Sequence, residues 1–217
     1  MIFGTKTSEP LRGAVAGAAL LLALCLPQAA RAFELGELMG WLAKTKSGQA
    51  TFVEQREVKG FDEPLRSEGE LSFAAPDRFE RRTLKPVREA LRVEGNVLTM
   101  TRGGRSRTLA LDAAPEAAAI VEAVRGTLTG NEATLQKHFR VRLTGKPEAW
   151  VLDLGPRAAE LARQVSDVQI RGVRGIVTVV EVWMVGGDRS HMDITPLTGA
   201  AVAARAAASS PPAASSP

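Results

Sequence analysis

Few side chains in this sequence have the chemistry of an active site. The 217-residue chain contains two histidines, His138 and His191, and neither lies in a nucleophile motif such as Gly-x-Ser-x-Gly. Asp188, His191 and Asp193 together offer oxygen and nitrogen atoms that a metal ion accepts. In a strand, however, His191 and Asp193 share a face while Asp188 lies in the preceding turn, so surface polar residues are the favoured interpretation. The sequence therefore predicts a protein that is not an enzyme and has no metal or cofactor.

The first 32 residues have the pattern of a secretory signal peptide. Lys6 and Arg12 precede an apolar run over residues 14–26, and a small-residue site at residues 30–32 follows it. This run is shorter than the roughly 20 residues of a membrane-spanning helix. We therefore expect cleavage after Ala32 and export of the chain that begins at Phe33.

Cys25 leaves an alternative open, because a lipidated cysteine would tether the protein to a membrane. Leu24 precedes it, where a lipoprotein signal has a small residue, so cleavage after Ala32 is the favoured interpretation. The exported chain then has no thiol, and its hydrophobic core alone must stabilise it.

Composition separates one domain from a tail. Residues 199–217 are rich in Ala, Ser and Pro and carry one charge, so a disordered tail is expected there and one domain over residues 33–198. The signal segment accounts for +2 of the net charge of +4. The remaining charge is modest, and no nucleic-acid partner is expected.

Alternating apolar and polar residues predict about ten antiparallel strands. Within residues 69–101 the alternation is interrupted at Pro76, Pro86 and Gly95. Glu181 interrupts a later apolar run and is interpreted as a residue on the wet side of its strand. Further strands are expected over residues 50–58, 106–111, 139–143, 149–154, 168–171, 176–185 and 190–195.

Two amphipathic helices accompany this sheet. The first begins near Leu35 and ends near residues 45–48, and the second runs from Pro115 to just before Gly130. A large, twisted antiparallel sheet curls, and an apolar helix can fill its concave side. The predicted fold class is therefore mainly β (α+β): an incomplete, strongly curled antiparallel β-barrel with a helical lid over an apolar cavity.

A particular spacing of residues runs through positions 69–100. It consists of Gly69, Leu71, Pro76, Phe79, Pro86, Leu91, Gly95, Leu98 and Met100. In this spacing the chain resembles the outer-membrane lipoprotein carrier family, the LolA-like proteins of the bacterial periplasm, as a divergent member. Gln55 and residues 188–190 look like further family positions. The chain departs from the family pattern at Ala75, where a basic residue is typical, and at Arg81 and Met100, where aromatic residues are typical.

The resemblance implies a monomeric periplasmic carrier. It would receive a lipoprotein from an ATP-driven inner-membrane release complex and pass it to an outer-membrane acceptor. Exposing an acyl chain of about 15 methylenes to water costs on the order of 12 kcal/mol, so such a cargo needs a shielding cavity. Because Ala75 replaces the basic residue that is typical of the family, a glycolipid or another acylated molecule is the alternative cargo. An envelope scaffold that binds a protein partner and has a filled core stays open as an alternative, as does a hydrolase that uses His138 or His191.

Large apolar side chains on the predicted strands and on the second helix are the candidate lipid-binding residues, with ordinary core as the competing interpretation. They are Phe73, Phe79, Leu91, Val93, Leu98, Met100, Ile120, Val124, Trp150, Leu152 and Trp183. Basic residues lie close together in this part of the sequence, and solvated outward positions of the strands are the favoured interpretation. The alternative is that they line up on one face of the meander as a patch for lipid headgroups or an acidic partner. They are Arg78, Arg81, Arg82 and Arg88, with Lys85, Arg92, Arg102, Arg105 and Arg107 nearby.

Overall fold

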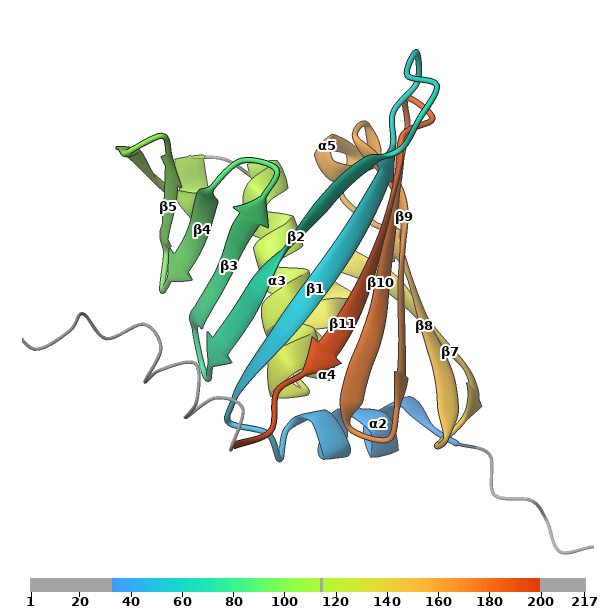
Figure 1. Cartoon of the computed structure of the whole chain (residues 1–217). Helices are drawn as coiled ribbons and strands as arrows, with labels where there is room; N and C mark the ends of the chain where they lie inside the picture. The colour runs from blue at the N-terminus through green and yellow to red at the C-terminus, as the bar shows by residue number, and fades with distance from the viewer. Residues whose placement is uncertain (1–32, 114, 200–217) are drawn as a thin grey trace, which may run out of the picture. The chain divides into compact units, whose positions relative to one another are not determined.

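Most of the described chain lies in one antiparallel sheet (Figure 1). The computed structural model describes residues 33–113 and 115–199. The predicted signal peptide, with Cys25, and the predicted tail after Gly199 lie outside the described residues. The strands are β1 (Ser47–Glu57), β2 (Leu65–Ala74), β3 (Arg78–Lys85), β4 (Glu89–Glu94), β5 (Val97–Arg102), β6 (Arg105–Ala110), β7 (Phe139–Lys146), β8 (Ala149–Pro156), β9 (Val165–Val173), β10 (Ile176–Met184) and β11 (Arg189–Pro196).

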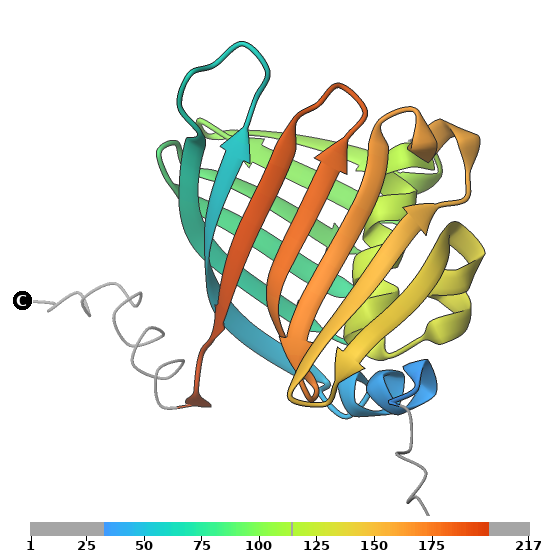
Figure 2. The same cartoon turned by 90° about the vertical axis from the view of Figure 1, so that its right-hand side faces the viewer.

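The strand order explains where the helices must lie. It runs β6-β5-β4-β3-β2-β1-β11-β10-β9-β8-β7, so the first and last strands pair in the middle of the sheet and β6 and β7 form its edges. The chain passes from one edge to the other through η2 (Leu111–Ala113), α3 (Pro115–Thr129) and α4 (Glu132–His138). Figures 1 and 2 show the sheet curled around these helices. We call the face toward the helices the concave face and the opposite one the convex face.

The concave side of β7–β10 is filled by a hydrophobic core. In the antiparallel register, Leu152 of β8 lies opposite Ile170 of β9, which lies opposite Val180 of β10. Helices α2 (Leu35–Leu42), α4 and α5 (Ala159–Ala162) pack onto this row with apolar residues such as Leu38, Leu135 and Leu161. The side chains of the protein itself therefore fill this part of the concave face.

A smaller core lies under the other half of the sheet. Val93, Leu98 and Leu111 are buried there, with residues of β3–β6 and of α3 around them. Both cores lie on the concave face, and the central strands β1 and β11 separate them in the strand order. No helix within residues 33–113 and 115–199 has the length and apolar character needed to cross a bilayer.

The predicted fold class is confirmed, while the α2–β1 boundary and the helix α4 differ from the prediction. The described residues contain eleven strands, in agreement with the prediction of about ten. Strand β1 begins at Ser47 because α2 already ends at Leu42. Helix α4 was not predicted, since Gly130 was taken as the end of the helical segment. Asn131 follows it and caps a new helix, with its side-chain oxygen accepting a hydrogen bond from the backbone N–H of Thr134 at 3.1 Å.

Candidate functional site

An apolar crevice lies between α3 and the concave face of β2–β5. Its volume is about 190 Å³. The sheet contributes Phe73, Phe79, Leu91, Val93 and Leu98, and the helix contributes Ile120, Val121, Val124 and Leu128. Seven residues predicted to bind lipid thus lie around one crevice, while Val121 and Leu128 were not among the predicted site residues although they belong to the same helical stripe.

The register of the strands builds this wall. Phe73 lies opposite Phe79, Phe79 opposite Val93, and Val93 opposite Leu98 across four neighbouring strands. Side chains of directly paired residues point to the same face of a sheet. The alternation in each strand therefore adds one apolar side chain to a continuous row.

Polar contacts attach α3 to the sheet at one end of the crevice. The Arg125 side chain donates a hydrogen bond to the Gly95 carbonyl oxygen at 2.8 Å, and it also forms an ion pair with Glu122. Gly95 lies in the turn between β4 and β5. Further toward the start of the helix, Ile120 is 44% exposed. The apolar side of α3 is therefore only partly covered by the sheet.

The other four predicted lipid-binding residues lie elsewhere. Trp150 and Leu152 belong to the filled core, with exposures of 1% and 0%. Met100 shares the concave face of β5 with Leu98 but lies outside the crevice lining and is 38% exposed. Trp183 alternates with the core residue Val182 and lies on the convex face, 5.5 Å from the Arg189 guanidinium.

The predicted basic residues do not share one face, so the alternative of a single basic patch is wrong. Alternation within β3 puts Arg78 and Arg82 on the convex face and Arg81 on the concave face with Phe79. On the convex face, Arg82 and Arg92 both form ion pairs with Glu80. Arg88 is exposed in the turn between β3 and β4.

A charged cluster that was not predicted lies on the concave face. Glu54 is 5% exposed, and its carboxylate accepts hydrogen bonds from Ser67 at 2.9 Å, Ser190 at 2.6 Å and Arg81 at 2.5 Å. The Arg81 guanidinium lies 4.7 Å from the centre of the Phe52 ring. Burial acts to raise the pKa of Glu54, but the hydrogen bonds and the Arg81 charge outweigh it, and the pKa lies below its usual value.

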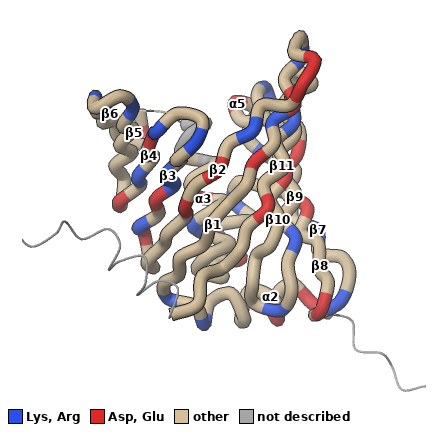
Figure 3. The backbone as a smooth tube through the Cα atoms, in the orientation of Figure 1, with Lys and Arg blue, Asp and Glu red and all other residues tan. Residues whose placement is uncertain are grey.

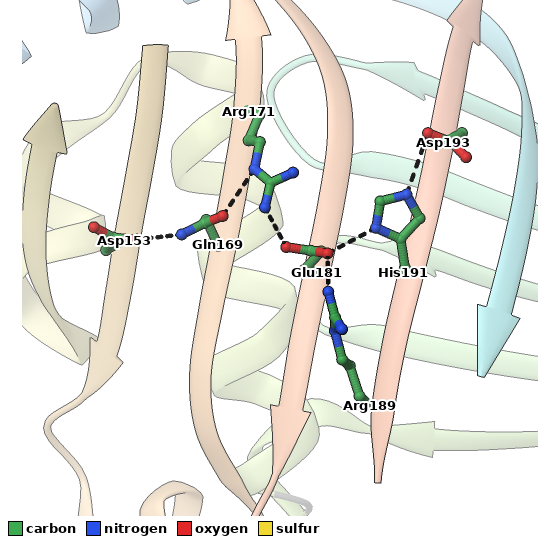
Figure 4. A network of polar contacts seen from close by, with 7 residues as sticks. All are labelled: Asp153, Gln169, Arg171, Glu181, Arg189, His191 and Asp193. Atoms are coloured by element: carbon green, nitrogen blue, oxygen red, sulfur yellow. Dashed lines mark hydrogen bonds and ion pairs between the residues drawn. The ribbon is translucent and has the colours of Figure 1, made fainter. Parts of the chain in front are cut away.

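On the convex face, Glu181 is the centre of a polar network across β8–β11 (Figure 4). Its carboxylate accepts hydrogen bonds from Arg171 and Arg189, both at 2.6 Å, and lies 2.7 Å from His191 Nδ1. Burial raises the pKa of Glu181, while the His191 and Arg189 hydrogen bonds and the two arginine charges lower it to a value below the usual one. Glu181 was interpreted as a residue on the wet side of its strand, but it is 1% exposed and is therefore a buried acid on the convex face.

The network accounts for the residues that were considered for metal binding. His191 Nε2 lies 3.3 Å from Asp193, whereas the Asp188 side chain accepts a hydrogen bond from the backbone N–H of Lys59. Among the described residues, no group of three or more potential ligands is placed to hold a metal ion.

Replacing Glu181 with glutamine is expected to lower the free energy of unfolding by about 1–3 kcal/mol at neutral pH. The amide cannot balance the charges of Arg171 and Arg189, although both guanidinium groups are partly exposed and can be hydrated. Urea unfolding measures the change. The control is Asp193→Asn, because Asp193 has a side chain that is 59% exposed and should change stability by less than about 0.5 kcal/mol. Equal effects of the two variants would contradict the central role of Glu181.

The chain was compared with protein families, curated proteins and solved structures. A family model described as outer membrane lipoprotein carrier protein LolA-like matches residues 27–216. No curated protein matches the chain. Solved structures are similar to the chain at low identity and with TM-scores below 0.5, so their likeness carries no argument.

Three of these structures illustrate the range of sequence identity, coverage and TM-score. A LolA superfamily protein from Nitrosomonas europaea is 10% identical, with 76% of this chain and 92% of that chain covered and a TM-score of 0.44. The MucA/MucB complex from Pseudomonas aeruginosa is 19% identical, with 77% and 58% covered and a TM-score of 0.44. The lipoprotein LppX from Mycobacterium tuberculosis is 7% identical, with 74% and 92% covered and a TM-score of 0.38.

Proposed function

Since the chain belongs to the family of outer membrane lipoprotein carrier LolA-like proteins, we propose that it is a periplasmic carrier that shields the acyl chains of a lipoprotein or another acylated lipid. The observation that carries this proposal is the crevice between α3 and β2–β5. Its wall consists of aliphatic and phenylalanine side chains from the sheet and from one helical stripe. Such a wall offers an acyl chain the apolar contacts that water lacks.

The size of the crevice determines how an acyl chain would enter it. Its volume of about 190 Å³ is below the roughly 300–1,000 Å³ of typical ligand sites. A long acyl chain therefore does not fit in the crevice alone, and a movement of α3 away from the sheet would enlarge it. The smaller core beneath α3 and the single Arg125 contact with the β4–β5 turn leave less to disrupt than the larger core does. In this proposal α3 is the lid, and it covers the apolar wall when the site is empty.

The route of the cargo follows from the family and from the N-terminal sequence. Cleavage of the segment before Phe33 would release the domain into the periplasm. There it would take cargo from an inner-membrane release complex and pass it to an outer-membrane acceptor. No catalytic step is needed, so replacing both His138 and His191 with alanine should leave cargo binding unchanged.

The test is to purify the protein from the periplasm without detergent and to record native mass spectra. We expect a bound species with an acyl chain, which organic extraction would identify, and micromolar binding of a fluorescent fatty acid. An unmodified mass that stays the same after incubation with lipoproteins and lipids, together with no probe binding, would overturn the proposal.

Replacing Val124 with aspartate is expected to weaken binding of the fluorescent fatty acid by about 100-fold. Val124 lines the crevice on α3, and a carboxylate there must lose its water when an acyl chain binds. The matched control is Val97→Asp on β5, where Val97 is 44% exposed and alternates with the concave residue Leu98. Probe titration and urea unfolding of both variants separate lost binding from lost folding, and equal affinities would place the acyl chain elsewhere.

One observation favours a second candidate, a scaffold that binds a protein partner. The larger core fills the concave face of β7–β10 with the chain's own side chains, as such a scaffold requires. In that case Leu91→Ala should lower stability by about 2–5 kcal/mol without any effect on an acyl ligand. A change in probe affinity in this variant would instead support the carrier.

A further inference from the structure

Three arginines of the β5–β6 hairpin lie on the concave face, at the edge of the sheet. On this hairpin the hydroxyl groups of Thr99 and Thr108 lie 3.3 Å apart, and those of Thr101 and Ser106 lie 2.9 Å apart. These two pairs occupy the convex side. The alternating residues must therefore point to the concave side, and they are Leu98, Met100, Arg102, Arg105, Arg107 and Leu109.

The packing of the leucines confirms this assignment. Leu98 lies opposite Leu109, and both belong to the smaller core with Val93. The next concave pair along the hairpin is Met100 with Arg107, and the last is Arg102 with Arg105. On the concave face of this hairpin, the apolar pair next to the crevice is therefore followed by Met100 with Arg107 and then by Arg102 with Arg105.

These arginines differ from three arginines on the neighbouring strands β3 and β4. Arg81, Arg82 and Arg92 each form an ion pair with a glutamate. Within the described residues, Arg102, Arg105 and Arg107 have no ion pair and no side-chain hydrogen bond, and all three are exposed. Glu89 lies opposite Arg102 in the register but forms no ion pair with it.

Like charges at paired positions of neighbouring strands repel each other. Arg102 and Arg105 are such a pair, and Arg107 follows on the same face. Figure 3 shows basic residues gathered at this end of the hairpin. An anion bound between the three guanidinium groups would remove the repulsion, and guanidinium groups bind phosphate oxygens in a bidentate manner.

We propose that Arg102, Arg105 and Arg107 bind the anionic phosphate group in the headgroup of an acylated cargo whose chain lies in the crevice. This inference rests on the proposed carrier function and adds the chemical class of the headgroup. Leu98 and Arg102 are separated by roughly 13 Å along the strand, so one lipid molecule can reach both regions. The site thus favours a phosphate-bearing lipid over a neutral one.

The test compares two ligands with the same palmitoyl chain, lysophosphatidylglycerol and monopalmitoylglycerol, below their micellar concentrations. Both compete with a fluorescent fatty acid for the purified protein. We expect the anionic lipid to bind about tenfold more tightly or better, and we expect higher salt to reduce this preference. Glycerol 3-phosphate, which has the phosphate but no chain, should not displace the probe.

The variant that carries Arg102→Gln, Arg105→Gln and Arg107→Gln should lose the preference and keep its affinity for monopalmitoylglycerol. A charge-matched control replaces three exposed arginines on other elements with glutamine, namely Arg66, Arg140 and Arg163, and should retain the preference. Three results would overturn this inference but not the carrier function. They are equal affinities for the two lipids, a preference that remains in the Arg102, Arg105 and Arg107 variant, and displacement of the probe by glycerol 3-phosphate. Failure of every acyl compound to bind would overturn the carrier function itself.

Discussion

Replacing Glu54 with leucine is expected to lower the free energy of unfolding by about 3–5 kcal/mol. The side chain of Glu54 is 7% exposed and that of its partner Arg81 is 24% exposed. Without the carboxylate, the Arg81 charge stays in a poorly hydrated position, and its Nε already has no hydrogen-bond partner among the described residues. Ser67 and Ser190 also lose their acceptor. Urea unfolding followed by circular dichroism measures the change.

A second variant separates the ion pair from simple packing. Replacing Glu54 and Arg81 together with leucine removes both charges, so this double variant should be more stable than Glu54→Leu alone. The control on the same strand is Glu57→Leu, because Glu57 is exposed and should change stability little. If the double variant loses as much stability as Glu54→Leu and Arg81→Leu lose separately when added together, the two side chains do not stabilise the fold as an ion pair.

The same pair predicts how stability depends on pH. The pKa of Glu54 is lower in the folded protein than in the unfolded chain, so the unfolded chain takes up a proton first as pH falls. The stabilisation is therefore complete above the usual glutamate pKa, near 4.5, and is lost as pH falls through the lower folded value. Unfolding curves between neutral pH and about pH 3 should show a shallower loss of stability below pH 4.5 in the double variant than in the original protein.

The sequence was sufficient to predict the sheet because its signal is local. Pro76, Pro86 and Gly95 interrupt the alternation at the ends of β2, β3 and β4, and the observed strands end close to these positions. The row of Phe73, Phe79, Val93 and Leu98 follows from the same alternation once neighbouring strands pair. Local periodicity therefore predicts both the strands and one wall of the crevice.

What could not be predicted depends on contacts between distant parts of the chain. Alternation alone does not say which half of a curled sheet receives α2, α4 and α5, so Trp150 and Phe79 looked equivalent in the sequence. Glu54 and Ser190 are brought together only because β1 pairs with β11. The basic residues were expected on one face because they are close in sequence, whereas adjacent residues of a strand point to opposite faces.

Replacing Trp150 with alanine is expected to lower the free energy of unfolding by about 3–5 kcal/mol. The indole ring is 1% exposed, and its Nε1 donates a hydrogen bond to the Arg174 carbonyl oxygen at 2.8 Å. The ring lies so close to Gly172 that a side chain at that position would overlap with it. The surrounding strands cannot close the resulting cavity without losing their register, so most of the cost should remain.

This variant also tests how far the acyl site extends. Trp150 was a candidate lipid-binding residue, but it lies in the filled core and not in the crevice lining. At temperatures where the variant is folded, its affinity for the fluorescent fatty acid should therefore equal that of the original protein. Leu91→Ala, which changes the crevice wall, should alter that affinity.

Trp183→Ala provides the matched control, because Trp183 is a tryptophan on the convex face. Its loss should cost only about 1 kcal/mol, mainly through the contact with the Arg189 guanidinium. If Trp150→Ala weakens probe binding in the folded protein, the acyl chain must reach the concave face of β8. The helices α2, α4 and α5 would then have to move with the cargo, and the division of the concave face into a filled half and a binding half would be wrong.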